Sequence, residues 1–143
     1  MVLKNLRGKY FKIMKLSTIN LLNNIKKGIQ HKRKFAIVEN TKTNLEIIIC
    51  LQKLGYIKTF KLLEENLNIL VTLDFTNSGT VIYNLISFLA GSRTIKISYR
   101  TLFFLKQQVK GGTYILSTSK GILSDIEALK NKTGGILICW ICS

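Results

Sequence analysis

The apolar positions of residues 17–28 repeat at the spacing of an α-helix. They are Ile19, Leu22 and Ile25. Ser17 or Thr18 can serve as an N-cap, because a hydroxyl accepts a hydrogen bond from a backbone N–H of the first turn. Gly28 has the chemistry of a helix stop. The pattern therefore predicts a helix that ends at Gly28 and is followed by a charged bridge at residues 30–34.

A second helix is expected over residues 45–54, which are apolar on nearly all sides and should be buried against a sheet. The preceding sequence Thr43-Asn44-Leu45-Glu46 has the form of a capping box, which opens helices. Gly55 follows as the stop.

Strands are predicted at residues 35–39, 56–63 and 67–75, with Glu64-Glu65-Asn66 as the turn between the last two. Apolar residues alternate along the last of these strands, so one face should lie in the core. These residues are Leu67, Ile69, Val71, Leu73 and Phe75.

The second half predicts shorter elements. They are helices at residues 80–90 and 122–131, a helix or turn at 102–109, and strands at 94–99, 113–116 and 136–142. The order of elements predicts an α+β fold of two small α/β lobes. The N-terminal lobe is helix-strand-helix-strand-strand, and the C-terminal lobe is mostly β with short helices. We expect a basic N-terminal arm at residues 1–16 and lobes at 17–78 and 79–143.

Charge points to a polyanionic partner. Lys and Arg number 22 against 7 for Asp and Glu, which gives a formal net charge of +15. Lysines suit phosphate contacts, because each ammonium is a flexible point charge. The clusters Lys26-Lys27 and Lys32-Arg33-Lys34 crowd around one loop, so contact with phosphate is favoured over a merely solvated surface.

The first 16 residues carry five Lys or Arg and no acid. They lack the Ser and Arg richness of a transit peptide and the long apolar region of a secretory signal. We expect a retained basic arm. No apolar run approaches the roughly 18 residues of a membrane helix, so no membrane partner is expected.

A polar turn is predicted at Ser117-Thr118-Ser119-Lys120-Gly121, followed by Gly134-Gly135 and a terminal apolar run. Hydroxyls, backbone N–H groups and one cation in such a turn can bind a phosphate or a sugar edge. Glycine would allow close approach of the backbone.

These motifs resemble the bacterial-type small-subunit ribosomal protein eight family. That family has the same Ser-Thr-Ser-Lys-Gly, then a short helix, then Gly-Gly and a terminal strand that corresponds here to Ile138-Cys139-Trp140. The likeness extends from about Thr18 to the end. It implies a structural protein that binds small-subunit rRNA, with the turn as the main RNA-binding element and Gly134-Gly135 beside it.

The chain departs from the family pattern at two places. Ile136 stands where the family usually has Glu, and the Pro-Gly that often precedes the strand near Ile95 is missing. Tyr99 corresponds to a family tyrosine with the register displaced by one residue, and it is included among the expected RNA-binding residues on that basis.

Other chemistry is poorly supported by the sequence. Cys139 and Cys142 have C-x-x-C spacing, but they lie in a predicted strand, where residues three apart face opposite sides. His31 is the only histidine, so neither a zinc site nor a catalytic triad can be built. Ser117-x-x-Lys120 and Lys132-Thr133-Gly134 match short β-lactamase motifs in the wrong context. We expect no catalytic residue, metal or cofactor, and no small-molecule substrate.

The sequence thus predicts a structural constituent of the small ribosomal subunit whose partners are small-subunit rRNA and neighbouring ribosomal proteins. A free-standing basic regulator of nucleic acid or a small enzyme is the alternative. Heavy use of Ile, Lys and Asn and the absence of Pro are typical of an AT-rich coding sequence. This usage favours a mitochondrial ribosome, with a plastid ribosome as the alternative.

Overall fold

The computed structural model describes residues 2–73, 82–90, 93–108 and 111–142. The chain forms mixed α+β structure in two lobes, as predicted. The elements in order are α1 (Val2–Gln30), β1 (Phe35–Glu39), α2 (Lys42–Lys53), β2 (Thr59–Leu63), η1 (Glu64–Asn66), β3 (Asn68–Thr72), β4 (Asn84–Ser87), β5 (Lys96–Ile97), α3 (Tyr99–Gln108), β6 (Thr113–Thr118), β7 (Gly121–Ser124), α4 (Asp125–Lys130) and β8 (Gly135–Cys142).

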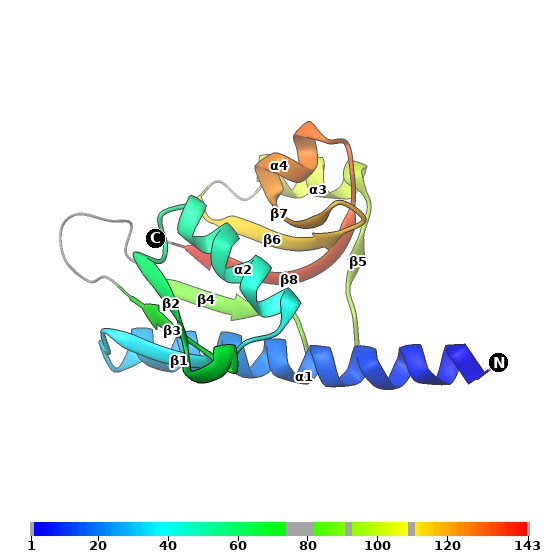
Figure 1. Cartoon of the computed structure of the whole chain (residues 1–143). Coiled ribbons are helices and arrows are strands. Elements are labelled where there is room, and N and C mark those ends of the chain that lie inside the picture. Colours follow the sequence, from blue (N-terminus) through cyan, green and yellow to red (C-terminus); the bar gives the residue numbers. More distant parts are fainter. Residues whose placement is uncertain (1, 74–81, 91–92, 109–110, 143) are drawn as a thin grey trace.

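Two antiparallel sheets organise the fold. The first has the strand order β1-β3-β2, and the second has the order β4-β8-β6-β7 with β5 also paired to β8. Helix α1 runs along one side of the molecule, where it contacts β1, β4 and α2, and its N-terminal end extends past the sheets (Figure 1). Helices α3 and α4 pack together beside β6.

Alternation along the strands places the core. In β1, Ala36 and Val38 are buried while Phe35 and Ile37 are exposed. One hydrophobic cluster joins the two sheets, because it contains residues from both halves of the chain. Its members include Leu21, Ile47, Ile69, Leu85, Ile115 and Ile141. The sheets are therefore held by a shared core.

The predicted start of the first helix is wrong. Ser17 and Thr18 lie inside α1, which already begins at Val2. Their hydroxyls bond to other elements: Ser17 Oγ donates to Glu39 Oε2 at 3.0 Å and Thr18 Oγ1 donates to Asn44 Oδ1 at 3.1 Å. Buried hydroxyls need partners, and here those partners lie in β1 and α2 instead of in the first turn of a helix.

Gly28 also does not end α1, which continues to Gln30. A Cβ atom at this position would lie 2.7 Å from Leu73 Cδ1. Gly28 is therefore a packing glycine that allows α1 to approach the end of β3 closely. The chain reverses after Gln30 through Lys32, which has a φ of 51°.

The second helix begins at Lys42, one residue before the first residue of the predicted capping box. Thr41 is its N-cap, and the Thr41 side chain accepts from the Asn44 backbone N–H at 3.1 Å. Asn44, the second residue of the predicted box, is instead buried in the polar contact with α1. The predicted stop is confirmed: α2 ends at Lys53 and Gly55 follows with a φ of 85°.

The helix predicted at residues 80–90 is wrong. Residues 82–90 contain strand β4, in which Leu85 pairs with Ile141 of β8; residues 80 and 81 lie outside the described residues. The spacing of Ile82, Leu85, Ile86 and Leu89 suits a helix, but pairing with β8 overrides this local pattern.

Several boundaries also move. Residues 122–124, predicted as helix, belong to β7, and only α4 is helical. The strands predicted at 56–63 and 94–99 shorten to β2 and β5, whereas the helix predicted from residue 102 begins at Tyr99. Strand β3 buries Ile69 and Val71, and Leu73 just after it is buried too, but Leu67 is exposed; Phe75 lies outside the described residues. Strands β1 and β8 and the turn at residues 64–66 match the prediction closely.

Candidate nucleic-acid interface

Residues 117–121, which we call the hydroxyl turn, form one end of the β6–β7 hairpin. Ser117 and Thr118 are the last residues of β6, Gly121 is the first residue of β7, and the two residues between them connect the strands. Ser119 and Lys120 form the tip, and both are exposed. Thr118 Oγ1 accepts from the Lys120 backbone N–H at 3.1 Å and donates to Gly121 O at 2.9 Å. Gly121 has a φ of 106°, which favours glycine. The Thr118 hydroxyl therefore shapes the turn, and the exposed tip is left for a partner.

Lys120 also reaches the end of α4. Its Nζ donates to Asn131 Oδ1 at 3.5 Å, and Asn131 is the C-cap of that helix. Lys120 also borders a depression between α2 and β7 together with Lys53, Glu46 and Glu127. The ammonium is thus held at the surface close to the loop that follows α4.

Gly134 and Gly135 lie where three strands come very close. A Cβ atom on Gly135 would clash with the carbonyl oxygen of Ser117, and a Cβ atom on Gly134 would clash with that of Ile97. The start of β8 can therefore pass between the end of β5 and the end of β6 only because these residues lack side chains. The structure brings the hydroxyl turn and the glycine pair together, as the sequence predicted.

The same crossing brings in Ser98, which the sequence did not single out. The Cα of Ser98 would lie 2.9 Å from a Cβ at Gly134. Ser98 Oγ accepts from the Thr101 backbone N–H at 3.3 Å, so it caps the first turn of α3. Tyr99 is the next residue, half-buried and in contact with Phe103. Only its position next to Tyr99 could have drawn attention to Ser98.

A partly buried ion pair lies at the end of the β6–β7 hairpin that is opposite the hydroxyl turn. Asp125 is fully buried and accepts from Lys106 Nζ at 2.8 Å, from the Tyr114 backbone N–H at 3.2 Å and from the Ile126 backbone N–H at 2.7 Å. These contacts tie α3, α4 and β6 together. Neither residue was singled out in the sequence, because nothing in the local pattern separates them from solvated charges.

The basic cluster forms a second surface at the other side of the molecule, around the C-terminal end of α1 (Figure 1). All five of its cations are exposed: Lys26, Lys27, Lys32, Arg33 and Lys34. His31 is exposed in the same loop.

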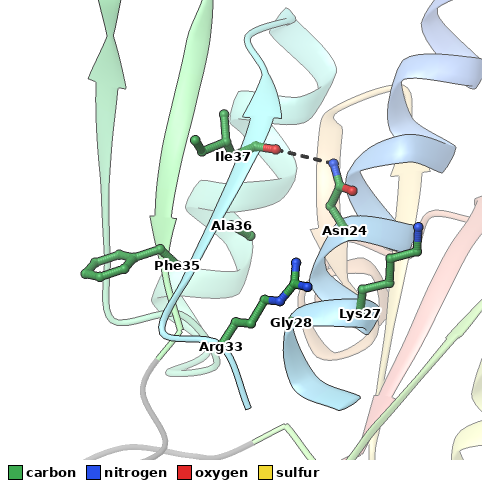
Figure 2. Close-up of a pocket in the computed structure, with 7 residues that line it drawn as sticks. All are labelled: Asn24, Lys27, Gly28, Arg33, Phe35, Ala36 and Ile37. Carbon is green, nitrogen blue, oxygen red and sulfur yellow. Dashed lines mark hydrogen bonds between the residues drawn. The ribbon is translucent and has the colours of Figure 1, made fainter. Parts of the chain in front are cut away.

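Two of these cations line a groove between α1 and β1 with a volume of about 290 Å³, the α1–β1 groove. Its lining residues are Asn24, Lys27, Gly28, Arg33, Phe35, Ala36 and Ile37, so it contains no acid (Figure 2). Figure 2 shows the Arg33 side chain in the space between the strand and the helix. Within the described part of the chain, neither Lys27 nor Arg33 makes a salt bridge. Both charges are therefore available to an anion.

The free edge of β1 faces this groove. The backbone bonds to β3 begin with Leu73 N, which donates to Lys34 O, and end with Asn40 N, which donates to Leu67 O. Between them, the N–H and C=O groups of even-numbered β1 residues face β3, and those of odd-numbered residues face away from it. Asn24 Nδ2 donates to Ile37 O at 3.3 Å, as Figure 2 shows. Asn44 Nδ2 likewise donates to Glu39 O at 3.0 Å. These two carbonyls are covered, which blocks the addition of a peptide strand at this edge.

Two of the three cysteines, Cys50 and Cys139, are buried. Burial raises the pKa of the Cys50 thiol to about 11, with a smaller contribution from the charge of Glu127, and burial also raises the pKa of Cys139. Both thiols therefore stay protonated at neutral pH. Cys139 and Cys142 lie on one strand, β8, as predicted. Among the described residues no group of three His, Cys, Asp or Glu could hold a metal ion.

Comparison with known proteins decides between the predicted classes. Residues 17–142 match the sequence profile of the family described as ribosomal protein S8. The chain belongs to the ribosomal protein S8 family. It is similar to "Small ribosomal subunit protein uS8m" of Acanthamoeba castellanii, with 31% identity over 116 residues, which cover 81% of this chain and 91% of that protein.

Relatives from bacteria and plastids match as well. "Small ribosomal subunit protein uS8" of Mesomycoplasma hyopneumoniae (strain 7448) is 33% identical over 126 residues, covering 85% of this chain and 92% of that protein. "Small ribosomal subunit protein uS8c" of Pleurastrum terricola is 30% identical over 135 residues, which cover 84% of this chain and 93% of that protein.

Membership of the S8 family makes the chain a structural component of the small ribosomal subunit and not an enzyme. Binding of rRNA is general for the family, and ribosomal RNA and other subunit proteins are its partners. Among the helices in the described residues, none is long and apolar enough to cross a bilayer.

Proposed function

We propose that this S8-family chain binds small-subunit rRNA mainly through the hydroxyl turn and the glycine pair, and that the α1–β1 groove binds RNA at a second place. One observation carries the proposal. Ser119 and Lys120 are exposed at a tip whose shape is fixed by Thr118 and Gly121. A rigid tip loses little conformational freedom on binding, so more of its interaction energy appears as affinity.

The chemistry of the tip suits A-form RNA. The minor groove of such RNA is wide and shallow and displays 2′-hydroxyls and base edges. Ser119 Oγ would donate to or accept from a sugar or an exposed base, and Lys120 would contact a phosphate. Gly121 leaves the backbone beside that tip unshielded by a side chain, whereas Gly134 and Gly135 allow β8 to pack closely against the neighbouring strands. Thr118 would contribute to RNA binding by fixing the shape of the turn, because its hydroxyl already makes hydrogen bonds within the turn.

The α1–β1 groove supplies the second contact. Lys27 and Arg33 line it without a neutralising acid, and Lys26, Lys32 and Lys34 are exposed nearby. A phosphodiester strand fits this charge, whereas a peptide strand is blocked by the bonds from Asn24 and Asn44. Two contacts on opposite sides of the protein would fix the relative positions of two RNA segments during subunit assembly.

We further propose that residues 1–16 act as a basic arm and that residues 17–78 and 79–143 form the two lobes, each with one contact surface. The arm carries five cations and no acid, and the family match begins at residue 17. A mitochondrial ribosome is favoured by the AT-rich residue usage and by the likeness to the uS8m protein; a plastid ribosome is the alternative, given the likeness to the uS8c protein.

Filter binding with small-subunit rRNA and with a scrambled RNA tests the proposal. Lys120→Ala should weaken binding to both RNAs and reduce the salt dependence by about one unit. Ser119→Ala should lower discrimination between the two RNAs by roughly 1–3 kcal/mol. Lys61→Ala removes an exposed lysine on β2, a strand that contributes no residue to the hydroxyl turn or to the lining of the groove, and serves as the control.

A wild-type protein that binds both RNAs equally would refute the role of the turn in recognition. Sedimentation gives an independent test, because a ribosomal protein travels with the small subunit at physiological salt. A free-standing regulator or a small enzyme would stay in the supernatant.

A further inference from the structure

Two lysines occupy the same unusual place at the ends of two helices. Lys32 follows α1 with a φ of 51°, and Lys132 follows α4 with a φ of 52°. Both values lie in the left-handed region, which side chains other than those of Asn and Asp rarely adopt.

The hydrogen bonds around the two lysines follow one motif. After α1, Lys32 N donates to Ile29 O at 3.3 Å and Arg33 N donates to Gly28 O at 2.8 Å. After α4, Lys132 N donates to Leu129 O at 3.2 Å and Thr133 N donates to Ala128 O at 3.0 Å. Both are Schellman motifs, and in such motifs the left-handed residue is usually glycine.

Helix α2 shows the same motif with the usual residue. Gly55 N donates to Gln52 O and Tyr56 N donates to Leu51 O, both at 3.0 Å, with Gly55 at a φ of 85°. The chain thus has glycine at this position in one helix and a backbone-strained lysine in two others. Strained residues of this kind cluster at functional sites, where the surrounding structure holds them in place.

The two lysines lie in the two candidate RNA surfaces. Lys132 is exposed, follows Asn131, which accepts from Lys120, and precedes Gly134 by two residues. Lys32 is exposed and directly precedes Arg33, which lines the α1–β1 groove. By contrast, Gly55 is remote in sequence from both sets of residues.

We propose that Lys132 is a phosphate-binding residue of the hydroxyl-turn surface, the role already proposed for Lys32 beside the α1–β1 groove. The inference rests on the proposed function. In each case the ammonium belongs to a residue at the C-terminal end of a helix, where the backbone carbonyls favour a cation. The motif fixes the backbone of the lysine before RNA binds. The side chain is therefore the group that has to be retained despite the backbone strain.

Replacement of Lys132 by glycine separates the effect of the backbone strain on stability from the effect of the side-chain charge on RNA binding. Lys132→Gly should raise the melting temperature, because the backbone strain that glycine relieves should exceed the favourable interaction of an exposed cation with the end of the helix. It should also weaken binding to small-subunit rRNA several-fold at about 0.1 M salt and lower the salt slope by about one. Lys132→Asn should give the same loss of binding, because Asn tolerates the left-handed region but carries no charge. Lys32→Gly is expected to behave alike.

Two controls make the test specific. Gly55→Lys places a lysine in the third motif and should lower the melting temperature without a gain in the salt slope. Lys130→Ala removes a neighbouring charge from the last turn of α4 without any change at a left-handed residue.

A Lys132→Gly protein that is more stable and binds RNA with unchanged affinity and salt slope would overturn the inference while leaving the proposed function intact. If the wild-type chain itself shows no preference for small-subunit rRNA, the proposed function fails, and the inference fails with it.

Discussion

The hydroxyl of Thr118 donates to the carbonyl oxygen of Gly121 at 2.9 Å and so closes the turn between β6 and β7. The Thr118 hydroxyl oxygen also accepts from the Lys120 backbone N–H at 3.1 Å, and Ser119 and Lys120 are the exposed part of the motif. The hydroxyl residues Thr118 and Ser119 therefore have different roles, and these roles can be separated by mutation.

Thr118→Ala should lower the free energy of unfolding by about 1 kcal/mol, because it removes a hydroxyl that takes part in two hydrogen bonds. Ser119→Ala should change stability by less than about 0.5 kcal/mol, since Ser119 is exposed and makes no hydrogen bond with the described residues. Urea unfolding of both variants measures the difference. Equal losses would contradict the assigned division of roles.

Gly135→Ala should destabilise the protein by roughly 1–3 kcal/mol, because the added methyl would meet the Ser117 carbonyl oxygen and Thr118 Cγ2. It should also weaken RNA binding by displacing the hydroxyl turn. Thermal unfolding and filter binding check the two effects.

Gly111→Ala is the comparison for Gly135→Ala, since a Cβ at Gly111 meets nothing within 4 Å although its φ is +92°. Its cost should be about 1–2 kcal/mol of backbone strain, and RNA binding should not change. Loss of RNA binding in this variant would show that general destabilisation, and not crowding at the turn, explains Gly135→Ala.

Asp125→Ala should cost roughly 3–5 kcal/mol, because it removes the carboxylate that holds Lys106 and two backbone N–H groups. Lys106→Met should also be destabilising, since it leaves a fully buried carboxylate without its cation. The double variant should be less destabilised than the sum of the two single variants. Additivity in a double-mutant cycle would mean that the pair contributes nothing to stability.

The Cys50 thiol predicts a loss of stability in alkali. Burial raises its pKa from the ordinary value of 9.0 to about 11 in the folded state. Between these two values the unfolded chain releases the proton while the folded chain keeps it, so stability is fully present below pH 9 and declines as the pH rises toward 11. Urea unfolding of wild type and Cys50→Ala across this range isolates the contribution. Parallel curves for the two proteins would contradict it.

The pattern of the chain predicted some elements well because local chemistry decided them. Strand β1 alternates between buried and exposed residues, and β8 is a continuous apolar run. Gly55 ends α2 because a left-handed residue is required there. By contrast, the apolar residues of β4 have helical spacing, and this segment forms a strand because it pairs with β8.

The candidate site shows the same division. The order of residues and the family resemblance together predicted Ser117, Thr118, Ser119, Lys120 and Gly121 as the RNA-binding turn, with the glycine pair beside it. The contribution of Ser98 and the partly buried Asp125–Lys106 pair could not be found this way, because their partners lie on other elements. The positions of Lys32 and Lys132 at left-handed residues were also hidden, since nothing in the sequence marks a lysine as the end of a Schellman motif.

The sequence by itself determined the mixed α+β class, the excess of positive charge and the residues of the hydroxyl turn, since all three follow from composition or from contacts within a few residues. The tertiary structure alone decided how far α1 extends, that Ser17 and Thr18 bond across to β1 and α2, and that the two sheets share one core. It also placed the two basic surfaces on opposite sides of the protein. These features depend on contacts between segments that are far apart in the chain, and such contacts cannot be inferred from the local pattern of residues.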